Sequence, residues 1–149
     1  SRWVAKVKES VLSQYFDVCV GPLVAYRDKE EGMEAPFIHP KMLEKWSEMT
    51  VESNYRKTYT RLFKPPFVVV NRTSSPGDIH RAPATLIKGK KSVAVENHLI
   101  VLTPRKGGMR SCRKLVKLLR SSTTDNYLNE RIRCRHLTVG SVKDIPWSD

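Results

Sequence analysis

Two acidic positions, Asp78 and Glu96, suggest the chemistry of a magnesium-dependent nuclease. Asp78 lies in a polar loop, and Glu96 opens the sequence Glu96-Asn97-His98 on a candidate strand. Carboxylates are the ligands that Mg²⁺ prefers in proteins. Such a site also needs a lysine two residues after the second acid, where this chain has His98. The required set of groups is therefore incomplete. A stand-alone nuclease with Asp78 and Glu96 on magnesium stays an alternative, and hydrogen bonding of these side chains within the fold is favoured over a metal or general-base role.

The sequence Lys64-Pro65-Pro66-Phe67 imitates a catalytic loop of amino-methyltransferases. In those enzymes an Asn or Asp before the two prolines accepts a hydrogen bond from the target amine. A lysine ammonium can only donate, so this copy cannot hold the amine. The chain also has no glycine-rich loop for a nucleotide-like cofactor, and its histidines and cysteines lack zinc-site spacing. We therefore expect no catalytic residue, no metal and no cofactor in this chain.

Residues suited to nucleic-acid binding are more prominent. The loop from Asn71 to Pro83 combines hydroxyls with two arginines, whose forked guanidinium groups match guanine edges and phosphate oxygens. An ordinary surface hairpin is the alternative. We expect Arg72, Ser74 and Arg81 to act at or near bases. We expect phosphate contacts from Arg27, Lys88, Lys90 and Arg105. Arg133 and Arg135, close to Arg131 and His136, suit either a DNA-backbone clamp or internal salt bridges.

The charge of the chain is strongly one-sided. The net charge is +12, and residues 64–149 hold 17 Lys or Arg against 6 Asp or Glu, whereas residues 1–63 hold 10 against 9. A field of this kind attracts a polyanion, although a solvated basic surface is the plainer interpretation. A general RNA- or single-strand-binding module is a further alternative. It is weakened by an aromatic content of 8%, because such modules stack bases on aromatic rings.

The pattern of apolar residues predicts an α+β fold: a twisted, mostly antiparallel β-rich core with flanking helices concentrated in the C-terminal third. We expect strands over residues 16–26 (interrupted at Gly21-Pro22), 37–39, 67–70, 84–87 and 93–102. We expect helices over 3–15, 41–49 and 109–120, then one capped by Thr124 and one capped by Thr138 or Ser141 that ends before Pro146. Residues 50–63 are predicted to be irregular or a short helix.

Three segments in order resemble a known family: Pro65–Ser74 (PPFVVVNRTS), Val93–Leu102 (VAVENHLIVL) and Asn129–Thr138 (NERIRCRHLT), followed by Asp144-Ile145-Pro146. They resemble the C-terminal target recognition domain of bacterial N6-adenine DNA methyltransferases, which is similar to the domains of type I restriction specificity subunits. The resemblance runs from about Leu12 to Trp147.

This resemblance implies a single DNA target-recognition domain over residues 1–149, a fragment of a longer restriction-modification or DNA methylation protein. Its partners would be double-stranded DNA, read in the major groove by the Val20–Glu34 and Asn71–Arg81 loops, and a catalytic methyltransferase domain in the same chain or complex. That missing domain would bind S-adenosylmethionine and flip the adenine. The basic face of the 109–120 helix suits either DNA or solvent, and the alternative is that this helix packs on the catalytic domain. The scattered cysteines and the lack of a long apolar run predict a cytoplasmic protein without a membrane span.

Overall fold

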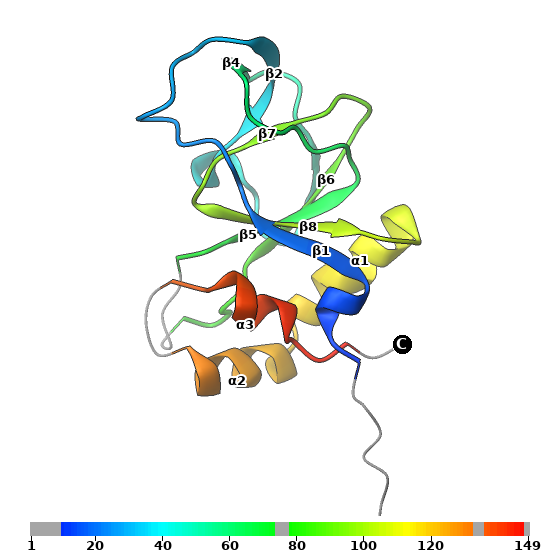
Figure 1. Cartoon of the computed structure of the whole chain (residues 1–149). Coiled ribbons are helices and arrows are strands. Elements are labelled where there is room, and N and C mark those ends of the chain that lie inside the picture. The colour runs from blue at the N-terminus through cyan, green and yellow to red at the C-terminus, as the bar shows by residue number, and fades with distance from the viewer. Residues whose placement is uncertain (1–9, 74–77, 133–135, 148–149) are drawn as a thin grey trace, which may run out of the picture.

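The computed structural model describes residues 10–73, 78–132 and 136–147. Across this part of the chain, eight strands and three α-helices follow one another in the order of Figure 1. The strands are β1 (Phe16–Val20), β2 (Met33–Ile38), β3 (Glu48–Thr50), β4 (Tyr55–Thr58), β5 (Phe67–Asn71), β6 (Ala84–Lys88), β7 (Ala94–Val95) and β8 (Leu99–Pro104). The α-helices are α1 (Gly108–Leu119), α2 (Ser122–Arg131) and α3 (Val139–Lys143), and short 3₁₀ helices cover Leu12–Gln14 and Pro40–Met42.

The strands form two sheets of unequal size. The larger sheet has the order β1-β8-β5-β6-β3, and the smaller one has the order β4-β2-β7. Neighbouring strands are antiparallel except for the pairs β3–β6 and β2–β7. Figure 1 shows the larger sheet between the smaller sheet above it and the α-helices below it. The expected α+β class, with a mostly antiparallel core and helices in the C-terminal third, is therefore confirmed.

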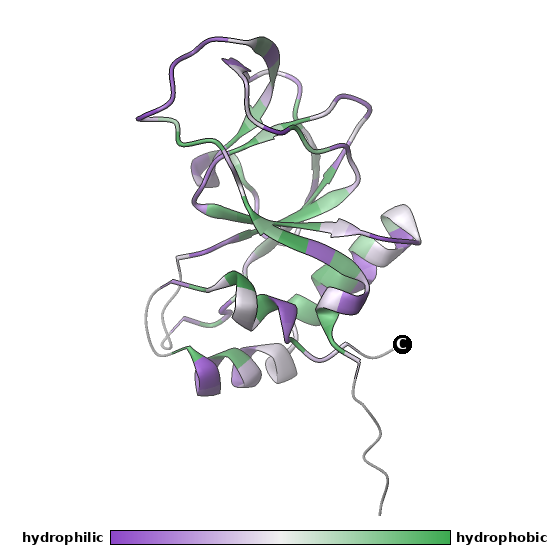
Figure 2. Ribbon diagram, in the orientation of Figure 1, coloured by the Kyte–Doolittle hydropathy of each residue, from purple (hydrophilic) through white to green (hydrophobic). Residues whose placement is uncertain are grey.

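Both faces of the larger sheet are buried, and β5 shows how the sequence produces this. Successive side chains of a strand point to opposite faces. Phe67 and Val69 pack in the core shared with the smaller sheet, whereas Val68 and Val70 pack in the core under the helices. A strand with two buried faces needs an apolar residue at every position, which explains the continuous run. In Figure 2 these central strands are hydrophobic and the outer loops are hydrophilic.

The helices cover one face of the larger sheet through the apolar side of α1. Cys112, Leu115 and Leu119 on α1 are fully buried at helical spacing. Burial raises the pKa of the Cys112 thiol to about 12. Ser121 caps α2 by accepting a hydrogen bond from the amide of Thr124, and Thr138 caps α3 in the same way. The expected helix over 109–120 and the Thr138 cap are confirmed, and the cap of α2 lies three residues before the expected Thr124.

Three expected elements differ from the structure. Residues 41–49 form the end of a 3₁₀ helix, a turn and the start of β3 in place of a helix. Residues 50–63 contain β4, and the expected strand over 93–102 is divided into β7 and β8, which belong to different sheets. The expected helix over 3–15 falls largely on residues that the structure does not describe. Among the described residues, no helix is both long and apolar enough to cross a membrane.

Candidate nucleic-acid interface

The turn between β7 and β8 supports the first of the two expected reading loops, the segment between β1 and β2. Gly21 donates its amide proton to the carbonyl of Leu99 (2.8 Å), and the amide of Asn97 donates to the carbonyl of Leu23 (2.8 Å). A Cβ atom on Gly21 would lie 2.2 Å from the carbonyl oxygen of Glu96, so only glycine permits this approach. The start of the loop is thereby fixed to the turn.

The same turn also holds the second loop, which starts at the end of β5. The Arg72 amide donates to the carbonyl of His98 (3.1 Å), and the Arg72 guanidinium donates through Nη1 to the carbonyl of Asn97 (3.1 Å). The Arg72 carbonyl accepts from the amide of Leu137 (2.7 Å). Arg72 was expected to act at or near bases, and in the structure its half-buried side chain supports the turn. One hydrogen-bonded path thus links both loops and the segment before α3.

Glu96 and His98 stabilise the turn itself. Glu96 Oε1 accepts hydrogen bonds from the backbone amide of His98 and from its ring Nδ1. This agrees with the favoured interpretation that these groups bond within the fold. Within residues 10–73, 78–132 and 136–147, no group of three or more His, Cys, Asp or Glu side chains is placed to hold a metal ion.

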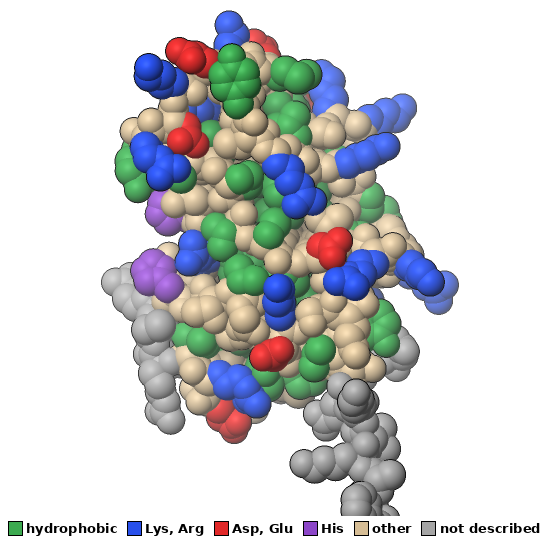
Figure 3. Space-filling model, viewed as in Figure 1, with side chains coloured by type: hydrophobic (Ala, Val, Ile, Leu, Met, Phe, Trp, Pro, Cys, Tyr) green, Lys and Arg blue, Asp and Glu red, His purple; other side chains and the backbone are tan. Residues whose placement is uncertain are grey.

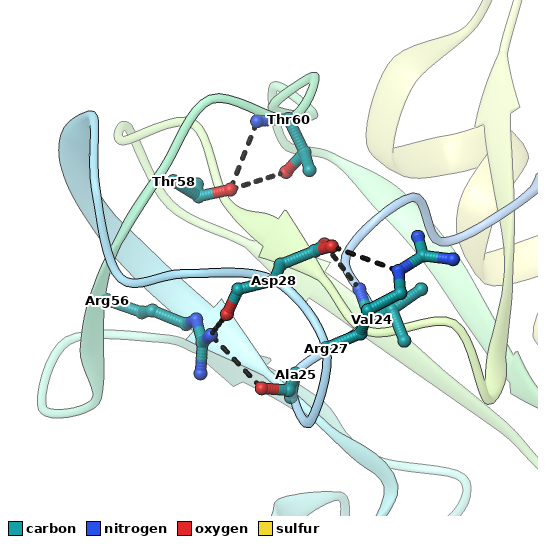
Figure 4. Close-up of polar contacts among 7 residues, drawn as sticks. All are labelled: Val24, Ala25, Arg27, Asp28, Arg56, Thr58 and Thr60. Atoms are coloured by element: carbon teal, nitrogen blue, oxygen red, sulfur yellow. Dashed lines mark hydrogen bonds and ion pairs between the residues drawn. The ribbon is translucent and has the colours of Figure 1, made fainter.

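The loop between β1 and β2 is ordered around Asp28 (Figure 4). Asp28 Oδ2 accepts from the amide of Val24 (2.9 Å), and Oδ1 lies 3.4 Å from Nε of Arg27. The Val24 amide is the main reason that the pKa of the Asp28 carboxyl lies below its ordinary value. The contact also orients Arg27, whose side chain is 70% exposed. Arg27 therefore remains available for the phosphate contact expected from the sequence.

Arg56, on β4, holds this loop from the smaller sheet. Its Nη2 donates to the carbonyls of Ala25 (3.1 Å) and Asp28 (2.7 Å), as Figure 4 shows. Its guanidinium lies 5.9 Å from the centre of the Phe37 ring, and its side chain is only 12% exposed. Its Nη1 lies 3.7 Å from Glu30. Arg56 was not among the residues expected from the sequence, because nothing local marks a largely buried arginine in a polar segment.

A shallow groove of about 380 Å³ runs between this loop and residues 58–60. Its wall at Thr58 is fixed by hydrogen bonds from the Thr60 amide (3.0 Å) and between the two threonine hydroxyls (2.9 Å). Tyr26 and Tyr59 are each 84% exposed, and Met33 is 73% exposed. Figure 3 shows hydrophobic side chains mixed with Lys and Arg at this end of the molecule. Exposed rings beside basic side chains give a surface suited to an anionic partner with apolar faces.

Arg81 was expected to act at bases, and the structure corrects this expectation. Its side chain is fully buried, with Nη1 donating to Oδ1 of Asn129 (2.8 Å) and to the carbonyl of Ile132 (2.8 Å). Its amide donates to Oδ1 of Asp125 (3.0 Å), whose Oδ2 lies 2.8 Å from His80 Nδ1. Arg81 joins the end of the second loop to α2 and does not reach the surface.

The other expected contact residues fall into two groups. Lys88, Lys90 and Arg105 are exposed, as phosphate contacts require. Lys88 lies 3.7 Å from Glu48 on β3, and Arg105 lies 3.1 Å from Asp17 on β1. Ser74, Arg133 and Arg135 lie outside the described residues.

Two solved structures share the fold of this chain. One is a chain of a type I restriction–modification (R-M) system, from work on the complex assembly and conformational transition of that system, with a TM-score of 0.58 and 13% sequence identity. The other is the HsdS subunit from Thermoanaerobacter tengcongensis, with a TM-score of 0.52 and 12% identity. The matches cover 97% of this chain and 34% and 33% of those chains, so the chain spans about a third of their length.

No protein-family model matches the chain, and no curated protein matches it either. At 12–13% identity the two structural matches establish the fold alone. The predicted resemblance to chains of type I restriction systems is confirmed at that level.

Proposed function

We propose that the chain binds double-stranded DNA as the target-recognition part of a restriction-modification protein. The observation that carries this proposal is that the turn between β7 and β8 fixes the starts of two loops. DNA bases are read by side chains held at defined positions along a groove, and loops on a rigid scaffold meet that need. The fold shared with the HsdS subunit and the net charge of +12 support the same conclusion.

In this proposal the described arginines have different roles. Arg27, held by Asp28 and exposed at the tip of its loop, contacts DNA directly. Arg56 and Arg72 donate to backbone carbonyls and are positioning residues for the two loops. Arg81 is a structural residue of the second loop. The phosphate contacts supply affinity and fix the register of the chain on the duplex, and the loops supply the contacts to base edges.

The methylation chemistry belongs to a partner in this proposal. The chain has a lysine where an amino-methyltransferase loop needs an acceptor before its two prolines. A catalytic domain that binds S-adenosylmethionine, in the same chain or complex, would act on the adenine of the bound site. This chain would contribute sequence selection to that assembly.

The test is a binding experiment on the full chain with a duplex library of random sequence. Repeated selection and sequencing of the bound fraction should enrich one motif, and affinity should fall steeply with salt. Arg27→Gln should weaken binding, whereas Lys41→Gln, which removes one exposed charge from the 3₁₀ helix before β3, should leave it nearly unchanged. Equal affinity for duplex, single-stranded DNA and RNA would refute duplex recognition. Magnesium-dependent cleavage that is lost in Asp78→Ala would establish the nuclease alternative.

A further inference from the structure

Helix α1 carries a row of basic side chains along its exposed side. Arg110, Arg113, Lys117 and Arg120 are all exposed and follow one another at intervals of three or four residues, which places them on one face of the helix. We call these four residues the α1 row. We propose that the α1 row is a second contact for DNA, which binds the phosphate backbone beside the target site without reading its sequence. This inference rests on the proposed function.

The α1 row is electrostatically unfavourable within the chain itself. No Asp or Glu occurs between residues 97 and 124, where seven Lys or Arg are present. Like charges three or four residues apart destabilise a helix. The row contains three such neighbouring pairs, so its charges repel one another along the helix. A polyanion bound along the helix would remove this repulsion.

Only part of this charge is balanced inside the fold. Arg113 donates to Glu48 on β3 through Nε (2.8 Å) and Nη2 (3.2 Å), and this contact lowers the pKa of the Glu48 carboxyl. Arg120 lies 5.5 Å from the centre of the Trp46 ring. Among the described residues, Arg110 and Lys117 form no ion pair. These two side chains are the free charges of the α1 row.

The α1 row continues from one of the two loops of the proposed interface. A hollow beside α1 is lined by residues that include Trp46, Arg113, Lys117 and Arg120. A second hollow shares Trp46 and Arg120, and is otherwise lined by the loop after β5 and its surroundings: Lys45, Asn71, Thr73, Asp78, Ile79, His80 and Pro83. Trp46 also contacts the His80 ring at 5.1 Å between ring centres. From Arg110 to Arg120 the helix rises about 15 Å, the length of about four base pairs. A duplex bound at the loop after β5 would therefore extend along the α1 row.

The composition of this surface favours phosphate over a protein partner. From Arg105 to Arg120 the exposed positions are glycine, lysine or arginine. The buried centre of a protein–protein interface is depleted in lysine and enriched in aromatic residues. Among the large exposed hydrophobic side chains of the described residues, Ile79 lines the second hollow from the loop, whereas neither hollow is lined by Tyr26, Met33, Tyr55 or Tyr59. On the helix itself the exposed cations follow one another with no acid among them, and Glu48 on β3 offsets Arg113. Such a row suits a backbone of phosphates.

The test compares two double variants of the full chain. Arg110→Gln/Lys117→Gln removes the two free charges and keeps the contacts of Arg113 and Arg120. Lys64→Gln/Lys143→Gln removes the same net charge from exposed positions outside the row. Affinity is measured between about 50 and 200 mM salt on duplexes that extend at least five base pairs beyond the selected site. Each phosphate contact contributes about 0.9 to the slope of log affinity against log salt. Loss of two contacts should therefore lower the slope by about 1.8. Over this fourfold rise in salt, the fold-loss of affinity in the first variant should be about 12 times smaller than in the wild type.

The outcomes separate the inference from the proposed function. A smaller salt slope in the first variant alone, with the preference between sequences unchanged, supports the inference. Duplex binding with an unchanged slope, or an equal change in both variants, overturns the inference and leaves the proposed function intact. Binding of polyglutamate is measured as well. If the slope is unchanged and the first variant loses the polyglutamate binding of the wild type, the row contacts an acidic protein partner and the inference is overturned. No duplex binding by the wild type at low salt overturns both.

Discussion

Replacement of Arg56 by methionine should release the loop between β1 and β2 without unfolding the chain. Methionine keeps the unbranched apolar stem of the side chain. It removes the guanidinium, which donates to the carbonyls of Ala25 and Asp28 and lies over the Phe37 ring. Each carbonyl then loses a charged partner in a place only partly open to water, at a cost of about 1–2 kcal/mol. The ion pair with Glu30 adds little, because that carboxylate is 69% exposed. The loop should be destabilised by about 2–4 kcal/mol.

Native-state hydrogen exchange measures this effect directly. The amides of Val24, Arg27 and Asp28 are hydrogen-bonded within the loop, and their exchange reports its opening. A loss of about 2–4 kcal/mol corresponds to exchange that is about 30- to 1,000-fold faster at these three amides. Amides of β5 and β8 should keep their protection.

The matched control is Lys57→Met, at the neighbouring position of β4, where the side chain is exposed. It should change exchange in the loop by less than about twofold, since surface substitutions away from special contacts are nearly neutral. Unchanged protection in Arg56→Met would refute the role of Arg56 as the clamp of the loop. Equal acceleration throughout the chain would show that Arg56 stabilises the whole fold.

Three further predictions follow from the interior and from the contact between β3 and α1. Arg81→Ala should destabilise the chain by about 3–5 kcal/mol, because it creates a cavity and leaves buried acceptors without a donor; urea unfolding measures this, and a loss below 1 kcal/mol would contradict it. The depressed pKa of Glu48 means that its contact with Arg113 stabilises the fold above the ordinary glutamate value of 4.5 and is lost as the pH falls through the lower folded value. The difference in stability between the wild type and Glu48→Gln should therefore vanish in acid, and a difference that persists there would refute the assignment. Cys112, buried and with its pKa raised to about 12, should react with iodoacetamide only after denaturation, and labelling of the folded chain followed by peptide mapping would show otherwise.

The division of residues 93–102 shows what apolar alternation can and cannot predict. Val93, Val95, Leu99 and Val101 alternate along the expected strand, and all four are buried in the same core. Alternation reports which side chains are buried, and both sheets line this core. It therefore cannot distinguish one long strand from two strands in different sheets. The turn at Glu96–His98 depends on the partners of its backbone, which lie far away in the sequence.

The segment from Lys41 to Met49 illustrates the effect of tertiary pairing. Leu43 and Trp46 are spaced as on one face of a helix. The amide of Trp46 nevertheless donates to the carbonyl of Ala84 (2.6 Å), and the carbonyl of Ser47 accepts from the amide of Leu86 (3.0 Å). Pairing with β6 prevails over a weak local preference for helix.

The expected contact residues divide for a related reason. Exposure of Arg27, Lys88, Lys90 and Arg105 agrees with the expectation, because charged side chains in loops and at strand ends are usually solvated. Arg81 differs because its backbone and side-chain partners lie on and just after α2, more than 40 residues later. A single sequence shows an arginine in a polar loop and does not show the acceptors that fold against it.

The pairing of residues 10–12 with residues 145–147 has a consequence for assembly. The Leu12 amide donates to the carbonyl of Ile145 (2.9 Å), and the Trp147 amide donates to the carbonyl of Ser10 (2.9 Å). The two segments are therefore adjacent, so that the polypeptide enters and leaves the fold at neighbouring positions. A fold whose first and last segments pair in this way can be replaced, in a longer polypeptide, by another fold with the same pairing. The distance between the flanking segments then stays the same. The closure thus makes the fold a unit that can be exchanged without a change in the spacing of the segments on either side of it.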